Sequence, residues 1–139
     1  MGDFMADFPK RMVYVDDEPQ ARRIVKDAIG GDDDEDGYFL VTCATGRELI
    51  ARLKELQPDL ILLDLRMPDM NGPDTIDELR KTPAYNHAPV IFVTERKKVV
   101  MIDEYRALGV IGVIYKPFEP KELRLQIKKI WADYKATAS

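Results

Sequence analysis

The sequence predicts an α/β domain, a doubly wound five-stranded parallel sheet with helices on both faces. Short runs rich in β-forming residues alternate five times with stretches whose apolar residues recur at helical spacing. Most of the strand runs are continuously apolar, which is typical of strands buried on both faces of a parallel sheet. Right-handed crossovers then place helices on both sides. The length of 139 residues suits one domain of this kind.

The first two strand–helix units begin at residues 12–15 (MVYV), a short apolar strand. A helix is expected from Pro19, and Gly30-Gly31 gives it a stop. Residues 38–43 (YFLVTC) are rich in β-forming residues. The leucine stripe that follows them predicts a second helix that ends before Pro58.

The remaining three units start at residues 60–63 (LILL), 90–93 (VIFV) and 110–115 (VIGVIY). Each run is followed by apolar residues at helical spacing, and Gly109 stops the fourth helix. The third helix is the shorter one, and the closing helix extends past Trp131.

These elements place the domain at residues 11–135, between a flexible N-terminal segment, 1–10, and a C-terminal tail, 136–139. The acidic stretch 30–37 (GGDDDEDG) is expected to be a solvated loop, with attraction of a cation or a basic partner as the alternative.

Composition excludes several classes of function. The net charge of −4 and the pI near 5.1 argue against a nucleic-acid or membrane-surface binder. No apolar run is long enough to span a bilayer, and the N-terminus has no signal-peptide pattern. The single Cys43 has no disulfide partner within the chain, which suits the reducing cytoplasm.

Polar residues follow the carboxyl ends of four predicted strands. In a doubly wound sheet, ligands bind at this edge, where the winding direction reverses. Each residue alone has an ordinary explanation as a helix cap or a surface lysine, but the set as a whole is hard to explain in this way. The set consists of Asp16, Asp17, Asp64, Thr94 and Lys116.

The chemistry of such a site follows from its charges. Carboxylates crowded together repel each other unless a cation lies among them, and oxygen ligands suit Mg²⁺. A lysine and a hydroxyl beside them would donate to a charged ligand. A metal, a lysine and a hydroxyl around a carboxylate nucleophile form a phosphoryl-transfer site with an aspartyl-phosphate intermediate.

Four segments closely resemble the receiver domain of two-component response regulators, as in the stand-alone chemotaxis type. They are VYVDDEPQARRIV, PDLILLDLRMPDMNG, VIFVT and YKPF, and the resemblance extends over roughly residues 11–134. It implies a flavodoxin-like (βα)5 fold. It also implies a cytoplasmic protein that accepts a phosphoryl group from a histidine kinase or phosphotransfer protein, and that is not a conventional enzyme.

The resemblance assigns roles to the site residues. Asp64 would be the phosphoacceptor. Asp17 would coordinate Mg²⁺ (or Mn²⁺) directly and Asp16 through water. Asp64 and the Arg66 backbone carbonyl would complete the protein ligands.

Two further residues would act on the phosphoryl group. Thr94 would bind a phosphoryl oxygen and move on activation, and Lys116 would pair with the phosphate. The Lys116–Pro117 bond is expected to be cis.

Glu95 departs from the pattern of the family, which has a small residue at this position. A carboxylate there would crowd the phosphoryl group unless Arg96 or Arg66 held it away. The sequence therefore predicts a gated site in which phosphorylation and hydrolysis are both slow.

Val113 also departs, because it lies where the family has its switch aromatic. Tyr115 shares its strand face, with core packing as the first interpretation and a substitute switch as the second. Residues 96–98 (RKK) oppose the macrodipole of the fourth helix, which indicates a later helix start or a partner surface.

The resemblance implies a downstream protein partner at the face formed by helix 4, strand 5 and helix 5, and allows a phosphorylation-dependent homodimer. The alternative is a pseudo-receiver, an interaction module that is not phosphorylated. The chain stops soon after the fifth helix, so we expect either a stand-alone regulator or a piece of a longer one.

Overall fold

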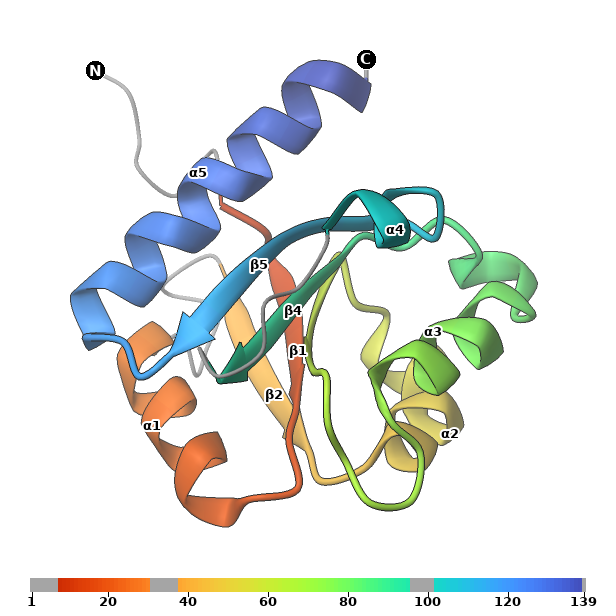
Figure 1. The fold of residues 1–139 in the computed structure, drawn as a ribbon, viewed down its shortest axis with the longest axis horizontal. Helices are drawn as coiled ribbons and strands as arrows, with labels where there is room; N and C mark the ends of the chain where they lie inside the picture. Colours follow the sequence, from red (N-terminus) through yellow and green to blue (C-terminus); the bar gives the residue numbers. More distant parts are fainter. Residues whose placement is uncertain (1–7, 31–37, 96–101, 139) are drawn as a thin grey trace.

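The computed structural model describes residues 8–30, 38–95 and 102–138 and contains a five-stranded parallel sheet (Figure 1). The strand order is β2-β1-β3-β4-β5, and every neighbouring pair is parallel. This confirms the predicted doubly wound sheet. The strands are β1 (Arg11–Val15), β2 (Phe39–Cys43), β3 (Leu60–Asp64), β4 (Val90–Glu95) and β5 (Val110–Lys116).

The helices cover both faces of the sheet. One core cluster joins the sheet to α1 and α5, and the other joins its opposite face to α2, α3 and α4 (Figure 1). A short 3₁₀ helix, η3 (Pro83–Tyr85), follows α3. The α-helices are α1 (Pro19–Ile29), α2 (Gly46–Leu56), α3 (Gly72–Arg80), α4 (Ile102–Arg106) and α5 (Pro120–Ala138).

Local sequence explains where two of these helices begin. The Thr45 side chain accepts a hydrogen bond from the Glu48 amide at 3.0 Å, and the Asn71 side chain accepts one from the Asp74 amide at 2.9 Å. Each bond satisfies an amide that has no partner within its helix. α2 and α3 therefore begin directly after the ends of β2 and of the loop that follows β3.

β3 lies at the centre of the sheet, between β1 and β4, and all five of its residues are buried. The chain passes from β1 to β2 on one side and from β3 to β4 and β5 on the other. The winding direction therefore reverses between β1 and β3, and the carboxyl ends of these two strands flank the crevice where such sheets bind ligands.

Packing or regular structure extends beyond both predicted ends of the domain, residues 11 and 135. Phe8 was placed in a flexible segment, but it is only 3% exposed and its ring lies 5.1 Å from that of Tyr38. At the other end, α5 continues to Ala138, into the predicted tail 136–139. The local sequence pattern did not predict the burial of Phe8, because its partner Tyr38 is distant in the sequence. The end of α5 was missed because no residue there marks a stop.

Some predictions fall outside the described residues. These include most of the acidic loop, at 31–37, and the basic segment 96–98. No helix in the described part of the chain is long and apolar enough to cross a membrane.

Candidate functional site

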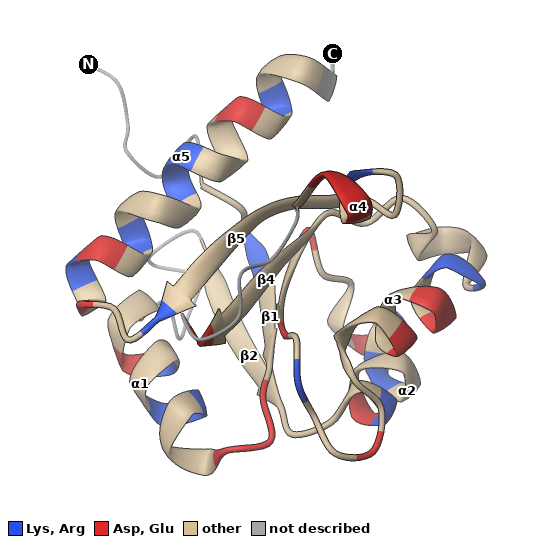
Figure 2. Cartoon of the chain, in the orientation of Figure 1, with Lys and Arg blue, Asp and Glu red and all other residues tan. Residues whose placement is uncertain are grey.

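The five predicted site residues lie together at the carboxyl edge of the sheet. Asp16 and Asp17 follow β1, where the connection to α1 is acidic (Figure 2), and Asp64 is the last residue of β3. Thr94 lies near the end of β4 and Lys116 at the end of β5. A cavity of about 400 Å³ opens at this edge. Its lining residues are Asp17, Glu18, Asp64, Arg66, Thr94, Glu95 and Lys116.

Three carboxylates converge at the site. Asp16, Asp17 and Asp64 each offer one oxygen, and these atoms lie within 4.8 Å of one another. Asp16 is fully buried and Asp64 is 8% exposed, whereas Asp17 is exposed. Like charges at this spacing are unfavourable without a cation, and an all-oxygen set of this kind suits a hard divalent ion. The residues present therefore fit a divalent metal site.

In the described part of the chain, three groups donate to the Asp16 carboxylate. Lys116 Nζ lies 2.9 Å from Asp16 Oδ2, and the Tyr14 hydroxyl donates to the same oxygen. The Glu18 backbone amide donates to Oδ1 at 3.0 Å. Burial, and next the charge of Asp16, raises the pKa of Tyr14 far above its ordinary value, so the hydroxyl stays protonated and remains a donor.

Asp64 has fewer partners than Asp16 among the described residues. The Arg66 amide donates to Oδ1 at 3.3 Å, and Lys116 Nζ lies 3.8 Å from Oδ2. Burial raises the pKa of Asp64 to about 6, against the charge of Lys116, which lowers it. Burial alone would lower the pKa of Lys116, but its bond to Asp16 and the charges of Asp64 and Asp16 together raise it. Lys116 is therefore a cation that lies closer to Asp16 than to Asp64.

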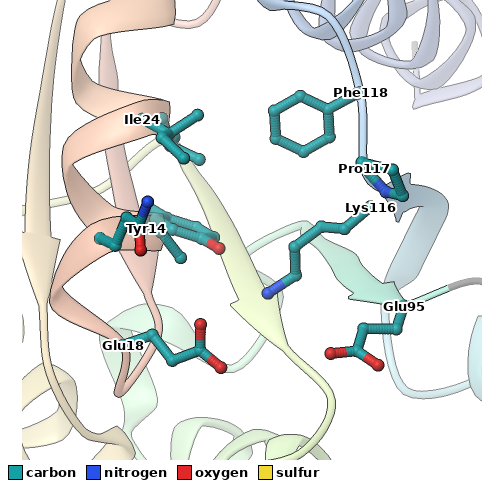
Figure 3. Close-up of a pocket in the computed structure, with 10 residues that line it drawn as sticks. Tyr14, Glu18, Ile24, Glu95, Lys116, Pro117 and Phe118 are labelled. Atoms are coloured by element: carbon teal, nitrogen blue, oxygen red, sulfur yellow. The ribbon is translucent and has the colours of Figure 1, made fainter.

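Thr94 and Glu95 end β4 beside this lysine. Thr94 is 3% exposed, and Glu95 is exposed and directly opposite Lys116 in the β4–β5 register. Figure 3 shows the side chains of Glu18 and Glu95 on either side of the Lys116 ammonium group. Among the described residues no ion pair joins Arg66 to Glu95, and Arg96 lies outside them. Glu18 and Glu95 therefore add negative charge on both sides of Lys116 at the mouth of the site.

Val113 and Tyr115 lie on β5 and are in register with residues of β4. Val113 pairs with Phe92 and packs against the core on the α2–α3–α4 side, as a half-buried residue. Tyr115 is half-buried opposite Thr94. The Lys116–Pro117 bond is cis, as predicted from the resemblance.

Sequence reasoning missed two residues of the site. Tyr14 was identified only as a strand residue, and Glu18 only as part of the acidic strand end. Alternation along β1 places Tyr14 and Asp16 on the same face, which is the signal that links the hydroxyl to the carboxylate. Tyr14 and Glu18 also line a second, more apolar cavity of about 420 Å³. Lys116, Ile24 and Phe118 line the same cavity (Figure 3).

Comparison with known proteins shows the family to which the chain belongs. Residues 12–128 match the response regulator receiver domain family. The chain is 34% identical to the chemotaxis protein CheY of Thermotoga maritima over 122 residues, covering 87% of this chain and 97% of that protein. It is 30% identical to the DNA-binding response regulator MtrA of Mycolicibacterium smegmatis over 86% of this chain, but spans only about half of that protein (49%).

Solved structures give the same result. The chemotaxis protein CheY4 of Vibrio cholerae superimposes with a TM-score of 0.74 at 27% identity, covering 87% of this chain and 98% of that one. The fold and the site define a receiver-type signalling domain. The chain belongs to the response regulator receiver domain family of two-component signalling.

Proposed function

We propose that the protein is a response regulator whose Asp64 accepts a phosphoryl group from a histidine kinase or phosphotransfer protein. The reaction depends on Mg²⁺ or Mn²⁺. One observation carries the proposal: Asp64, at the end of a central strand, has oxygens of Asp16 and Asp17 within 4.8 Å and Lys116 Nζ at 3.8 Å. Few other groups are needed, because positioning and charge neutralisation supply most of the catalysis of phosphoryl transfer.

The covalent step moves one phosphoryl group. A carboxylate oxygen of Asp64 attacks phosphorus, so that an O–P bond forms while the N–P bond to the donor imidazole breaks and its electron pair stays on nitrogen. Lys116 and the Thr94 hydroxyl donate to the phosphoryl oxygens. The three carboxylates and the Arg66 backbone carbonyl would hold the cation, which offsets the negative charge of the incoming group. The protein assists its own phosphorylation and dephosphorylation and is not a conventional enzyme.

The output is a change in binding to a protein partner. The face formed by α4, β5 and α5 supports this part of the proposal, because β5 is an edge strand and most of its residues are only half-buried. A phosphorylation-dependent homodimer could use the same face. We place the protein in the cytoplasm, with no direct contact to nucleic acid or membrane.

Phosphorylation by a small-molecule donor tests the function. Wild-type protein incubated with acetyl phosphate and Mg²⁺ should gain about 80 Da in intact mass, the mass of one phosphoryl group, and Asp64→Asn should gain nothing. No gain in wild type would support an unphosphorylated interaction module. The same gain in Asp64→Asn would place the modification elsewhere.

Glu95 gates this reaction. Its exposed carboxylate lines the cavity of Asp64 and repels an anionic donor. Glu95→Ala should be phosphorylated about two- to fivefold faster by acetyl phosphate and should lose the phosphoryl group faster. Glu95→Gln removes the charge but keeps the size of the side chain, so it shows which of the two slows the reaction. Equal rates and equal phosphoryl half-lives in all three proteins would show that Glu95 is no gate.

A further inference from the structure

Tyr14 is a polar side chain in the middle of an otherwise apolar stretch of β1. It is fully buried, and its hydroxyl reaches Asp16 Oδ2 on the same face of the strand. In Figure 3 this hydroxyl points toward the end of Lys116. The tyrosine therefore places a neutral donor next to Asp16. The neighbouring strand residues Val13 and Val15 belong to the core on the other face of the sheet and contribute only packing.

The hydroxyl shares its acceptor with the lysine of the site. Lys116 Nζ lies 2.9 Å from Asp16 Oδ2 and 3.8 Å from Asp64 Oδ2, so its first partner before phosphorylation is Asp16. When Asp64 carries a phosphoryl group, the lysine must turn toward that group. Asp16 then loses its charged donor while it remains fully buried.

We propose that Tyr14 is a positioning residue of the phosphorylation site, whose hydroxyl keeps Asp16 hydrogen-bonded when Lys116 turns to the phosphoryl group on Asp64. The inference rests on the proposed function. The same bond withdraws negative charge from Asp16 and so lowers the attraction of the carboxylate set for a divalent cation. Tyr14 thus acts on both the lysine and the metal through a single oxygen, Asp16 Oδ2.

The energetics set the size of the effect. A hydrogen bond to a charged group is more stabilising than one between neutral groups. A buried carboxylate that loses a donor is destabilised, because its desolvation is no longer offset. Without the hydroxyl, Lys116 is the side-chain donor that remains on Asp16 in the described structure. The lysine should leave Asp16 less readily, while Asp16 should attract a cation more strongly.

Tyr14→Phe removes the oxygen and keeps the ring. Tyr38→Phe is the matched control, because Tyr38 is also buried and donates to a backbone carbonyl, Ile29 O, at 2.9 Å, away from the carboxylates. Three measurements apply to each protein: stability in urea, the Mn²⁺ dissociation constant from the signal of free Mn²⁺ in electron paramagnetic resonance, and the rate of phosphorylation by acetyl phosphate.

Tyr14→Phe should bind Mn²⁺ roughly three- to tenfold more tightly and yet be phosphorylated about tenfold more slowly. Tyr38→Phe should lose stability with both site properties unchanged. A role in packing alone would leave metal affinity unchanged, and general damage to the site would weaken it. Either result in Tyr14→Phe would overturn the proposal.

The two measurements also separate this inference from the proposed function. If wild type takes up no phosphoryl group while Tyr14→Phe binds Mn²⁺ more tightly, the phosphoacceptor function fails and the action of Tyr14 on Asp16 stands. If wild type is phosphorylated and Tyr14→Phe matches it in both properties, the function stands and the role of Tyr14 fails.

Discussion

Asp64 shows how a single residue can be held in a state that is unfavourable for folding. It ends a strand that is buried on both faces and it has only 8% of its surface exposed. Among the described residues its partners are one amide at 3.3 Å and a lysine at 3.8 Å that lies closer to another carboxylate. Burial therefore raises its pKa to about 6, from an ordinary value of 3.8.

Asp64→Asn should stabilise the metal-free protein at pH 7.5. The folded state holds the Asp64 proton between about pH 4 and pH 6 and the unfolded state does not, so the free energy of unfolding falls as the pH rises through this window. The loss in free energy of unfolding caused by the ionised Asp64 is complete above about pH 6 and absent below about pH 4. We expect a gain on the order of 2 kcal/mol at pH 7.5 that shrinks toward pH 4.5, measured by urea unfolding in EDTA.

The control for this prediction is Asp69→Asn, at an exposed carboxylate that pairs with an exposed Arg47 at 3.3 Å. Such surface pairs contribute little to stability, so this variant should differ from wild type by less than about 1 kcal/mol. A stabilisation by Asp64→Asn that is the same at pH 4.5 and pH 7.5 would contradict the electrostatic explanation.

At the scale of elements, α2 and α3 meet where Gly46 faces Thr75. A Cβ atom on Gly46 would lie 2.1 Å from Thr75 Oγ1, and Thr75 is fully buried with its hydroxyl bonded to Asn71 O at 2.9 Å. This bond fixes the hydroxyl near the start of α3, so Thr75 cannot simply turn away. The close approach therefore requires glycine at the first residue of α2.

Gly46→Ala should destabilise the protein by about 2 kcal/mol or more, because the added methyl group forces the two helices apart. The measurement is chemical unfolding of wild type, Gly46→Ala, Thr75→Ala and the double variant. Since Thr75→Ala removes the clashing oxygen, the double variant should be more stable than the sum of the two single changes predicts. Strict additivity would show that the helices do not meet in this way.

At the scale of the whole molecule, the site exists only because distant segments converge. Lys116 reaches Asp16 across 100 residues of sequence, and the two side chains lie 2.9 Å apart. The five residues lie at or just after the ends of four strands, β1, β3, β4 and β5, on the same edge of the sheet. Parallel order alone brings such residues together, which is why strand ends could be used to predict the site.

The sequence predicted the fold well because its signals are local and repeated. The continuously apolar run of residues 60–63 predicts a strand buried on both faces. Strand runs that alternate with stretches of helical spacing then restrict the possible topologies to a parallel sheet covered by helices. Burial of Phe8 and the bond from Tyr14 to Asp16 were not predicted, because each depends on how one side chain meets residues placed by the fold. A tyrosine in a strand is ordinarily explained by β-propensity alone.

The assembled carboxylates also predict that a metal stabilises the entire domain. The set of Asp16, Asp17 and Asp64 exists only in the folded state, so a cation that binds it raises the free energy of unfolding by mass action. At a Mg²⁺ concentration about tenfold above the dissociation constant, the gain is about 1.4 kcal/mol, which corresponds to a rise of roughly 3–6 °C in Tm. Thermal unfolding in EDTA and in increasing Mg²⁺, at constant ionic strength, measures this effect.

The double variant Asp17→Asn/Asp64→Asn keeps the fold but lacks two of the three carboxylates, so its Tm should not respond. An equal rise in both proteins would mean that Mg²⁺ acts on the surface as a whole and not at this site.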